Sequence, residues 1–165
     1  MSFVPPEEYY KNLPRKYIGS GALYLNEKGE ILIVKPKYKE GWEVPGGVVE
    51  PNESPQEACI REIKEELGLN INPKQLLVMD FRSLNGYIGD AIMLLYFGGT
   101  LNQEEIDKIK LDSEELSEYR FVTLDQAEIL VTERLKKRLP KVVNAYKTGT
   151  CISLKDGEEF HISTK

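Results

Sequence analysis

The segment from Ser54 to Gly68 carries a complete set of helix start and stop signals. Ser54 can cap the helix, Pro55 occupies the first helical position, and Glu57 completes a capping box with Ser54. Leu67 is the last apolar residue of the pattern, and Gly68 suits the left-handed conformation that commonly ends helices. Any fold of this chain must therefore accommodate a helix of defined length at this point.

Three stripes run along this helix when its residues are placed at 100° intervals. One stripe is apolar, one is mixed and solvated, and one is dominated by Glu62, Glu65 and Glu66. Like charges at i,i+4, such as Glu62 and Glu66, destabilise a helix, and a hard divalent cation removes this repulsion by binding carboxylate oxygens. The alternative is an acidic surface relieved by Arg61 and Lys64, which the helix alone favours because Glu/Lys-rich helices are common.

The residues around the helix favour the metal-binding interpretation. Gly47, Glu53 and the run Arg61–Leu69 match the Nudix box, GX5EX7REUXEEXGU, at every specified position. A chance match anywhere in the chain has a probability on the order of 10⁻⁷. The chain therefore resembles the Nudix hydrolase family over Gly47–Leu69, and more loosely over the preceding Trp42–Gly46.

The resemblance implies an α/β (α+β) Nudix fold, in which an α/β/α sandwich with a mixed β-sheet holds a loop–helix–loop. No linker or repeat divides the chain, so residues 1–165 are expected to form a single domain. Periodicity and turn residues predict strands at Gly19–Leu25, Ile31–Val34, Trp42–Val44, Gln75–Phe81, Ala91–Phe97 and Tyr119–Thr123. Further predicted elements are a short helix at Leu101–Ile109, a helical segment at Asp125–Tyr146 interrupted near Thr132 and at Pro140, and a hairpin at Cys151–His161.

The resemblance also implies roles for individual residues. A Mg²⁺ site, or a Mn²⁺ site, would have three side-chain ligands and one backbone carbonyl ligand, from Glu62, Glu65, Glu66 and Gly46. Glu53 would tie the loop to the helix, and Arg61 would orient the glutamates of the box. The bound cation would neutralise phosphate oxygens and lower the pKa of an attacking water.

The general base varies among Nudix enzymes, and a later loop sometimes supplies it. Glu114, Glu115 and Glu118 are the later candidates here, and Glu115 is ranked slightly ahead. Each of the three could equally be an ordinary surface carboxylate.

Several residues near the box are candidates for substrate contacts. Lys35, Lys37 and Arg82 could bind phosphate oxygens, and Trp42 could stack on a base. Lysines are usually solvated, however, and an aromatic residue beside Pro-Gly-Gly could equally belong to the core.

Substrate identity depends on signatures outside the box. Those of ADP-ribose, NADH and coenzyme A hydrolases are missing, which leaves nucleoside triphosphates, including oxidised forms, as the expected substrates. Tyr87 lies where dinucleoside polyphosphate hydrolases often carry a tyrosine, so that activity is an alternative. A Nudix nucleotide-binding regulatory domain without activity is a second alternative, although such domains usually lose a glutamate of the box. A relative of isopentenyl-diphosphate isomerase is a third, but neither cysteine has a recognisable counterpart there.

Composition narrows the classes of partner. A net charge of −5 argues against a general binder of nucleic acid polymers, which normally has a basic face. The longest apolar run, Ala91–Phe97, is far below the roughly 20 residues that span a bilayer, and two cysteines are too few for a disulfide framework. We expect a cytoplasmic protein with a small nucleotide as its partner, and the sequence leaves monomer and homodimer open.

Overall fold

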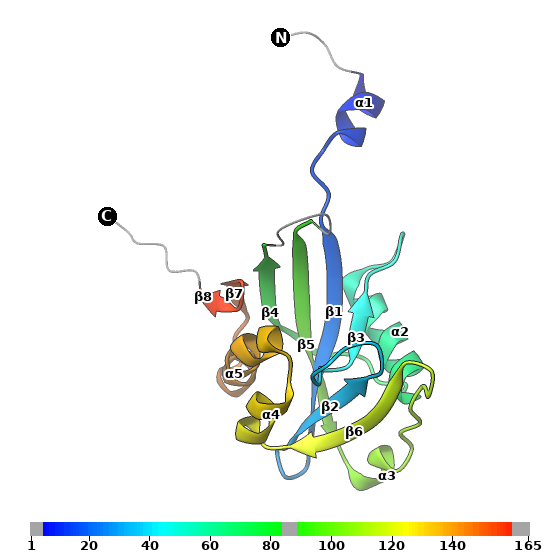
Figure 1. Cartoon of the computed structure of the whole chain (residues 1–165), viewed down its shortest axis with the longest axis vertical. Helices are drawn as coiled ribbons and strands as arrows, with labels where there is room; N and C mark the ends of the chain where they lie inside the picture. The colour runs from blue at the N-terminus through cyan, green and yellow to red at the C-terminus, as the bar shows by residue number, and fades with distance from the viewer. Residues whose placement is uncertain (1–4, 84–88, 160–165) are drawn as a thin grey trace, which may run out of the picture.

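A mixed β-sheet is the central element of the computed structural model, which describes residues 5–83 and 89–159 (Figure 1). Its strands are β1 (Tyr17–Asn26), β2 (Ile31–Pro36), β3 (Gly46–Val48), β4 (Gln75–Arg82), β5 (Ala91–Leu101), β6 (Leu116–Val122), β7 (Ile152–Lys155) and β8 (Glu158–Glu159). The strand order is β6-β2-β1-β5-β4-β7-β8, and β3 pairs with β1 beside this path. β1 is parallel to β5 but antiparallel to β2 and β3.

Helices cover both faces of this sheet. The helices of the described chain are α1 (Pro6–Lys11), α2 (Pro55–Leu67), α3 (Gln103–Ile106), α4 (Leu124–Leu130) and α5 (Glu133–Thr148). Of these, α1 has no buried residue and lies apart from the sheet (Figure 1). α2 packs on β1 and β3, whereas α5 packs on β4 and α4 packs on α5 and β2. Within the described ranges, no helix combines the length and the apolar character needed to cross a membrane.

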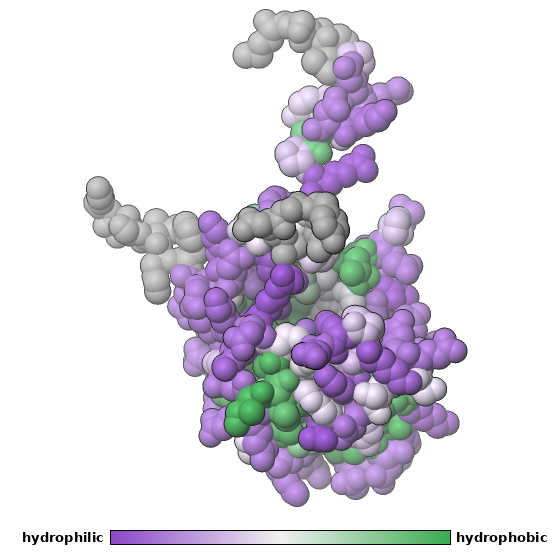
Figure 2. All heavy atoms as spheres, in the orientation of Figure 1, coloured by the Kyte–Doolittle hydropathy of each residue, from purple (hydrophilic) through white to green (hydrophobic). Residues whose placement is uncertain are grey.

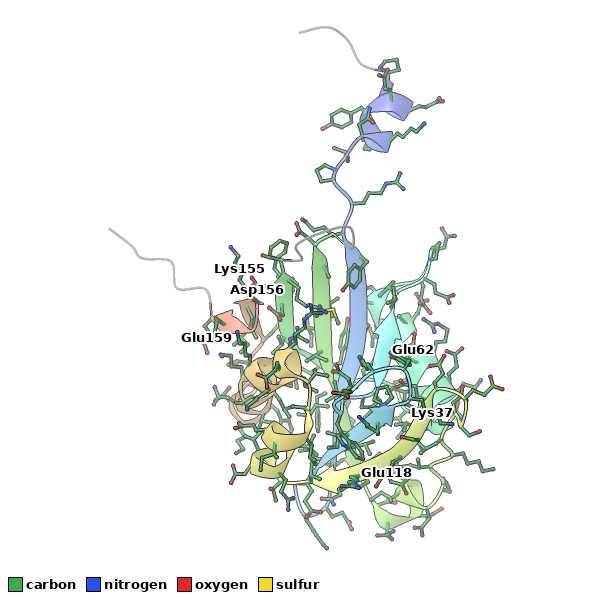
Figure 3. All side chains as sticks on the ribbon, viewed as in Figure 1. Lys37, Glu62, Glu118, Lys155, Asp156 and Glu159 are labelled. Carbon is green, nitrogen blue, oxygen red and sulfur yellow. The ribbon has the colours of Figure 1, made fainter. Side chains whose placement is uncertain are left out.

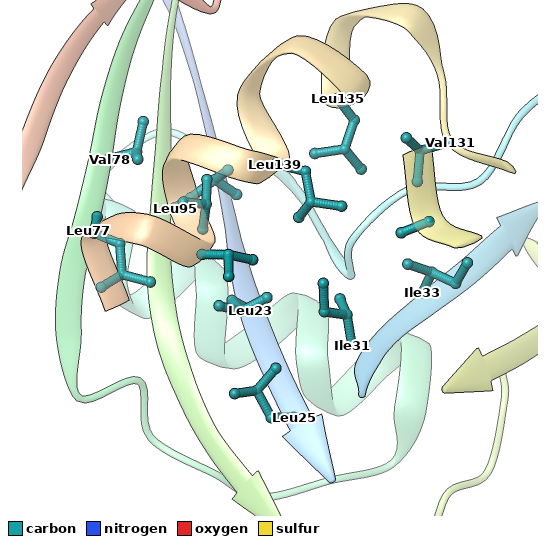
Figure 4. Close-up of a cluster of buried hydrophobic side chains, with 14 of the residues drawn as sticks. Leu23, Leu25, Ile31, Ile33, Leu77, Val78, Leu95, Val131, Leu135 and Leu139 are labelled. Atoms are coloured by element: carbon teal, nitrogen blue, oxygen red, sulfur yellow. The ribbon is translucent and has the colours of Figure 1, made fainter. Parts of the chain in front are cut away.

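Alternation along β1 explains how one sheet supports two cores, because successive side chains of a strand point to opposite faces. Leu23 and Leu25 join the cluster that includes Leu135 and Leu139 of α5 (Figure 4). Ala22 and Tyr24 point the other way and join Cys59, Ile63 and Leu67 of α2. The predicted α/β/α arrangement with a mixed sheet is therefore confirmed.

The predicted helix of the box begins and ends where its signals lie. The Ser54 side chain accepts a hydrogen bond from the Glu57 N–H, and the Glu57 carboxylate accepts one from the Ser54 N–H. Gly68 follows the last turn with a left-handed φ of 69°. The apolar stripe is buried on the sheet, so the acidic stripe must lie elsewhere on the helix surface.

The prediction of a strand at Trp42–Val44 was wrong. Trp42 and Glu43 form only isolated bridges, to Val131 and Val34, and the strand is β3, which starts at Gly46. In the sequence, Gly46 and Gly47 look like the end of a strand. In the structure, their lack of side chains allows this backbone to pair closely with Gly19–Gly21 of β1.

Two further differences concern helices. The helix predicted over Leu101–Ile109 is reduced to α3, because Leu101 still belongs to β5 and Asn102 caps the helix. The interruption near Thr132 is present, since Thr132 caps α5, but the interruption at Pro140 is absent. Leu139 and Val142 on either side of Pro140 are both buried in the same core, and this packing offsets the missing N–H of the proline.

The predicted C-terminal hairpin is present as β7 and β8, with left-handed φ values at Asp156 and Gly157 between the strands. Its expected last residue, His161, lies outside the described residues, as does Tyr87.

Candidate active site

Two glycines bring the loop before α2 into contact with the sheet and with the helix. A Cβ atom on Gly46 would lie 2.3 Å from the Ser20 carbonyl oxygen. A Cβ atom on Gly47 would lie 2.2 Å from Oε1 of Glu62. Because neither position has room for a side chain, the backbone of β3 fits between β1 and a carboxylate of α2.

Glu66 is a buried carboxylate in the last turn of α2, with 7% of the residue exposed. Its Oε2 accepts a hydrogen bond from the Gly46 N–H at 2.8 Å. Burial raises the pKa of Glu66 to about 8, and the charges of Glu62 and Glu115 act in the same direction. A carboxylate in this position is stabilised by any cation that approaches it.

Glu62 lies one turn earlier on α2, against Gly47 and beside β3 (Figure 3). Burial raises its pKa, whereas the hydrogen bond and charge of Arg61 lower it. The charge of Glu115 again raises the pKa. Glu62 and Glu66 therefore form a pair of partly desolvated carboxylates on one face of the helix.

Arg61 connects the loop to the helix through several side-chain hydrogen bonds. Its Nε and Nη2 donate to the Glu53 carboxylate at 2.9 and 3.1 Å, and Nη2 also donates to the Val48 carbonyl at 3.0 Å. Its Nη1 donates to Glu62 and to Glu65, both at 2.9 Å. These bonds lower the pKa of Glu53 and raise that of Arg61. Arg61 and Glu53 are thus placed to fix the position of Glu62 relative to the loop.

The three glutamates of the acidic stripe do not meet at one point. The Glu65 side chain is 56% exposed and pairs with Arg61. Among the residues that the structure describes, no three acidic, histidine or cysteine side chains are arranged as a metal site. Glu65 would have to turn away from Arg61 to join Glu62 and Glu66.

Glu62 and Glu66 nevertheless fit a hard divalent cation. Their oxygens are the ligands that Mg²⁺ and Mn²⁺ prefer, and the charge of Glu62 already raises the pKa of Glu66. A cation between them would remove this repulsion. Gly46 contacts Glu66 through its N–H group; its expected role through the carbonyl oxygen stays a prediction.

Glu115 is distinguished from the two other candidates for the general base. Its charge raises the pKa of both Glu62 and Glu66. Glu118 instead forms an exposed ion pair with Arg120 at 2.6 Å, and Glu114 is also exposed. The carboxylate of Glu115, just before β6, is therefore the member of this group whose charge reaches the carboxylates of α2.

A cleft of about 260 Å³ opens beside Glu66. β1 pairs with β2 at the hairpin end, through Leu25 and Ile31, and pairs with β3 through Gly19–Gly21. Between these two places on β1, β2 diverges from the sheet. Residues from β1, β2, β3 and β5 form the walls, together with Tyr38 and Lys39 of the following loop. Arg82 of β4 and two arginines of α5 line the same cleft.

The four residues expected to contact substrate occupy different surroundings. Arg82 lines the cleft. Lys35 and Lys37 instead donate hydrogen bonds to the backbone carbonyls of Gly41 and Ser113, and neither is among the cleft-lining residues of the described chain.

The position of Trp42 corrects the expectation that it stacks on a base. Trp42 is 7% exposed, lies in the core with Val131, and has the guanidinium of Arg120 4.8 Å from its ring centre. The ring is therefore buried in the core, where the Trp42 N–H also donates to the carbonyl of Leu130 in α4.

Sequence reasoning missed two cleft residues, Arg134 and Arg138. They are four positions apart on α5 and therefore lie on one face of that helix. This spacing was a signal, but it resembles that of any basic helix surface. Only the position of α5 on the sheet shows that it faces the cleft.

Comparison with known proteins gives a family match over most of the chain. The family model described as the NUDIX domain matches residues 16–146. The solved structure of the MutT protein from Methanosarcina mazei superposes with a TM-score of 0.65 and 25% identity. That match covers 82% of this chain and 96% of the other.

Two relatives with assigned names match over a shorter region. The RNA pyrophosphohydrolase of Hydrogenovibrio crunogenus is 39% identical over 57 residues, which is 34% of this chain and 34% of that protein. The human 8-oxo-dGDP phosphatase is 39% identical over 64 residues, which is 37% of this chain and 20% of that protein. The chain thus spans about a third or less of the length of these relatives.

Proposed function

The chain belongs to the NUDIX family, and we propose that it is a divalent-metal-dependent hydrolase that cleaves a phosphoanhydride bond in nucleoside-diphosphate-linked compounds. The observation that carries this proposal is the pair of partly desolvated carboxylates, Glu62 and Glu66, beside a cleft with arginines in its wall. The two relatives described above are named as a pyrophosphohydrolase and a phosphatase, which supports hydrolysis.

Mg²⁺ is the proposed cation, with Mn²⁺ as its substitute. Glu62 and Glu66 would hold it, and Glu65 and the Gly46 carbonyl would complete the ligands. When bound, the cation neutralises phosphate oxygens and lowers the pKa of the attacking water.

The remaining residues have positioning and proton-transfer roles in this proposal. Arg61 holds Glu62 in place through the bonds that it also makes to Glu53 and Val48. Glu115 is the proposed general base, because it is near enough to influence both carboxylates of α2. Its carboxylate is exposed, so a water molecule can reach it.

Nucleoside triphosphates, including oxidised forms, are the proposed substrates. The complete box without the signatures of ADP-ribose, NADH or coenzyme A hydrolases supports this choice. The name of the human relative, an 8-oxo-dGDP phosphatase, supports an oxidised nucleotide in particular.

A substrate panel tests the proposal. Nucleoside triphosphates, 8-oxo-dGTP, ADP-ribose, diadenosine tetraphosphate and sugar nucleotides would each be incubated with Mg²⁺ and with Mn²⁺. We expect a triphosphate to have the highest kcat/KM, and ¹⁸O-labelled water would identify the attacked phosphorus. A kcat/KM at least tenfold higher for diadenosine tetraphosphate would instead identify a dinucleoside polyphosphate hydrolase. Binding of nucleotides without any turnover would identify a regulatory domain.

A further inference from the structure

A second cavity of about 230 Å³ adjoins the cleft on the side of β4 and α5. The two cavities share Arg82, Arg134 and Arg138, and Lys137 adds a fourth cation to the second one. Four cations and three carboxylates (Asp80, Glu133 and Asp156) therefore line the second cavity, in a protein whose net charge is −5.

Arg138 is fixed in place beneath this cluster. Only 6% of the residue is exposed, and its Nε and Nη2 donate to Oδ2 of Asp80 at 2.8 and 2.6 Å. Oδ1 of Asp80 accepts a further bond from the Gly157 N–H at 3.1 Å. Nη1 of Arg138 has no hydrogen-bond partner in the described part of the chain, which leaves it available to a ligand in the cavities.

Arg82 and Arg134 have no ion pair or hydrogen bond through their side chains to any residue that the structure describes. Burial lowers the pKa of the half-buried Arg82, and the charges of Arg134 and Arg138 lower it further. Three carboxylates line the second cavity as well: Asp80 pairs with Arg138, Asp156 accepts a bond from the Ser83 N–H, and Glu133 precedes Arg134 on α5. The four cations of this cavity outnumber its three carboxylates, and within the described chain Arg82 and Arg134 form no ion pair with any of the three.

One ligand can contact both cavities, because they share three lining arginines. Small-molecule sites usually enclose about 300–1,000 Å³, and neither cavity alone reaches that range. A ligand that begins at Glu66 and fills the cleft would arrive at the arginines with its far end.

We propose that the arginine cluster of Arg82, Arg134 and Arg138 is a subsite for a second phosphate group of the substrate, separate from the anhydride that is hydrolysed. Guanidinium groups bind phosphate through paired, charge-assisted hydrogen bonds. Three guanidinium groups in a partly buried cluster provide more positive charge and more donors than a single neutral ligand group would need. The inference rests on the proposed function, because the hydrolysed anhydride defines the other end of the substrate.

The chemistry of nucleotides limits where this second phosphate can be. In a nucleoside triphosphate, the anhydride chain is attached to the 5′-oxygen of the ribose, so a separate phosphate on the sugar is attached to the 2′- or 3′-oxygen. Two sources share this chemistry. One is a phosphate monoester on that oxygen, and the other is the diester that links the nucleoside to the next one.

Binding of bisphosphates tests the subsite without hydrolysis. Adenosine 3′,5′-bisphosphate, its 2′,5′-isomer and adenosine 5′-monophosphate would be titrated calorimetrically into the full chain with Mg²⁺. We expect at least one bisphosphate to bind about tenfold more tightly than the monophosphate, as a hydrogen bond to a charged group allows. Arg134→Gln should remove this preference. Lys136→Gln is the matched control, because it removes the same charge from an exposed position of the same helix that lines neither cavity.

Three outcomes would overturn the subsite. They are equal affinity for all three compounds, a preference that survives Arg134→Gln, and a preference that Lys136→Gln removes to the same extent. The last outcome would reveal a long-range charge effect, which salt near 0.15 M should already suppress.

Kinetics then separates the two sources. The substrates would be nucleoside 5′-triphosphates with a free 3′-hydroxyl, with a 3′-phosphate, or with a 3′-diester to a second nucleoside. Arg134→Gln should lower kcat/KM about tenfold more for the phosphorylated compounds that the subsite accepts than for the compound with the free hydroxyl. An equal loss for all three would place the arginines on the 5′ chain and refute the subsite. Preferential binding of a bisphosphate without hydrolysis of any triphosphate would refute the hydrolase and leave the subsite standing.

Discussion

The two ends of the cleft carry opposite, unbalanced charge. At one end, the carboxylates of Glu62 and Glu66 are partly buried, and their pKa values are raised by burial. At the other end, Arg82 and Arg134 have no anionic partner among the described residues, and burial lowers the pKa of Arg82. The carboxylates of Glu62 and Glu66 fit a divalent cation, and the guanidinium groups of Arg82 and Arg134 fit an anion. A nucleotide bound together with a divalent cation supplies both. The visible face of the molecule is largely hydrophilic (Figure 2).

The two ends also differ in how they are held. Around the acidic end, Arg61 binds Glu53 of the preceding loop and Glu62 and Glu65 of α2, and all three carboxylates are at least partly exposed. The basic end depends on one buried ion pair, between Arg138 and Asp80. The first arrangement can rearrange when a cation binds, whereas the second is fixed before any ligand arrives.

Removal of the metal should have the largest effect, and only at the acidic end. We expect EDTA to abolish hydrolysis of every active substrate and millimolar Mg²⁺ or Mn²⁺ to restore it, because two carboxylates alone repel a phosphate. Binding of an adenosine bisphosphate to the arginine cluster should persist in EDTA, although more weakly. Full hydrolysis in metal-free buffer would show that the carboxylates of α2 do not act through a cation.

Neutralising single glutamates should have the next largest effect. Glu62→Gln and Glu66→Gln should each lower kcat at least about a hundredfold, on the order of 3 kcal/mol of transition-state stabilisation. Neither should lower the free energy of unfolding, because burial favours a neutral group at both positions. Lys64→Gln is the control on the exposed side of the same helix and should change kcat less than twofold. Similar small changes in all three variants would favour an acidic surface without a catalytic role.

The acidic end could be predicted from the sequence because its parts are local. Helix signals, the spacing of the glutamates and the glycines of the loop all lie between Gly46 and Gly68. Their order along the chain largely determines their order in space. That Glu65 shares a metal site with Glu62 and Glu66 stays a prediction, and helical spacing alone does not show that Arg61 pairs with Glu65 in this structure.

The basic end could not be predicted in the same way because it is assembled from distant segments. Arg82 comes from β4 and Arg138 from α5, and they meet only because α5 packs on β4. Lys35, by contrast, is close to the box in sequence, yet its amine binds the Gly41 carbonyl outside the cleft. Proximity along the chain was therefore a poor guide to substrate contacts, and packing of α5 was the missing information.

Breaking the ion pair under the basic end should cost stability. Asp80→Asn leaves Arg138 buried with a weaker acceptor, and we expect the free energy of unfolding to fall by about 2 kcal/mol. Urea denaturation would measure it. Glu159→Gln removes the same charge at an exposed site of β8 and should change stability by less than about 0.5 kcal/mol. Equal stability of Asp80→Asn and the unmodified chain would mean that the basic end is not fixed by this pair.

The smallest expected effect separates the capping of α2 from the positioning of its glutamates. Ser54→Ala removes the acceptor of the capping box and should lower the free energy of unfolding by about 1 kcal/mol. We expect kcat to change less than twofold. Ile63 and Leu67 remain buried on the sheet, and Gly47 still contacts Glu62, so the carboxylates keep their places.

Thr123→Ala is the matched control for Ser54→Ala, because Thr123 caps α4 with the same kind of capping box. Both variants should lose similar stability and keep their kcat. If Ser54→Ala alone lowered kcat tenfold, the N-terminal cap would be part of what positions Glu62 and Glu66. The acidic end would then depend on the cap of its helix as strongly as the basic end depends on Asp80.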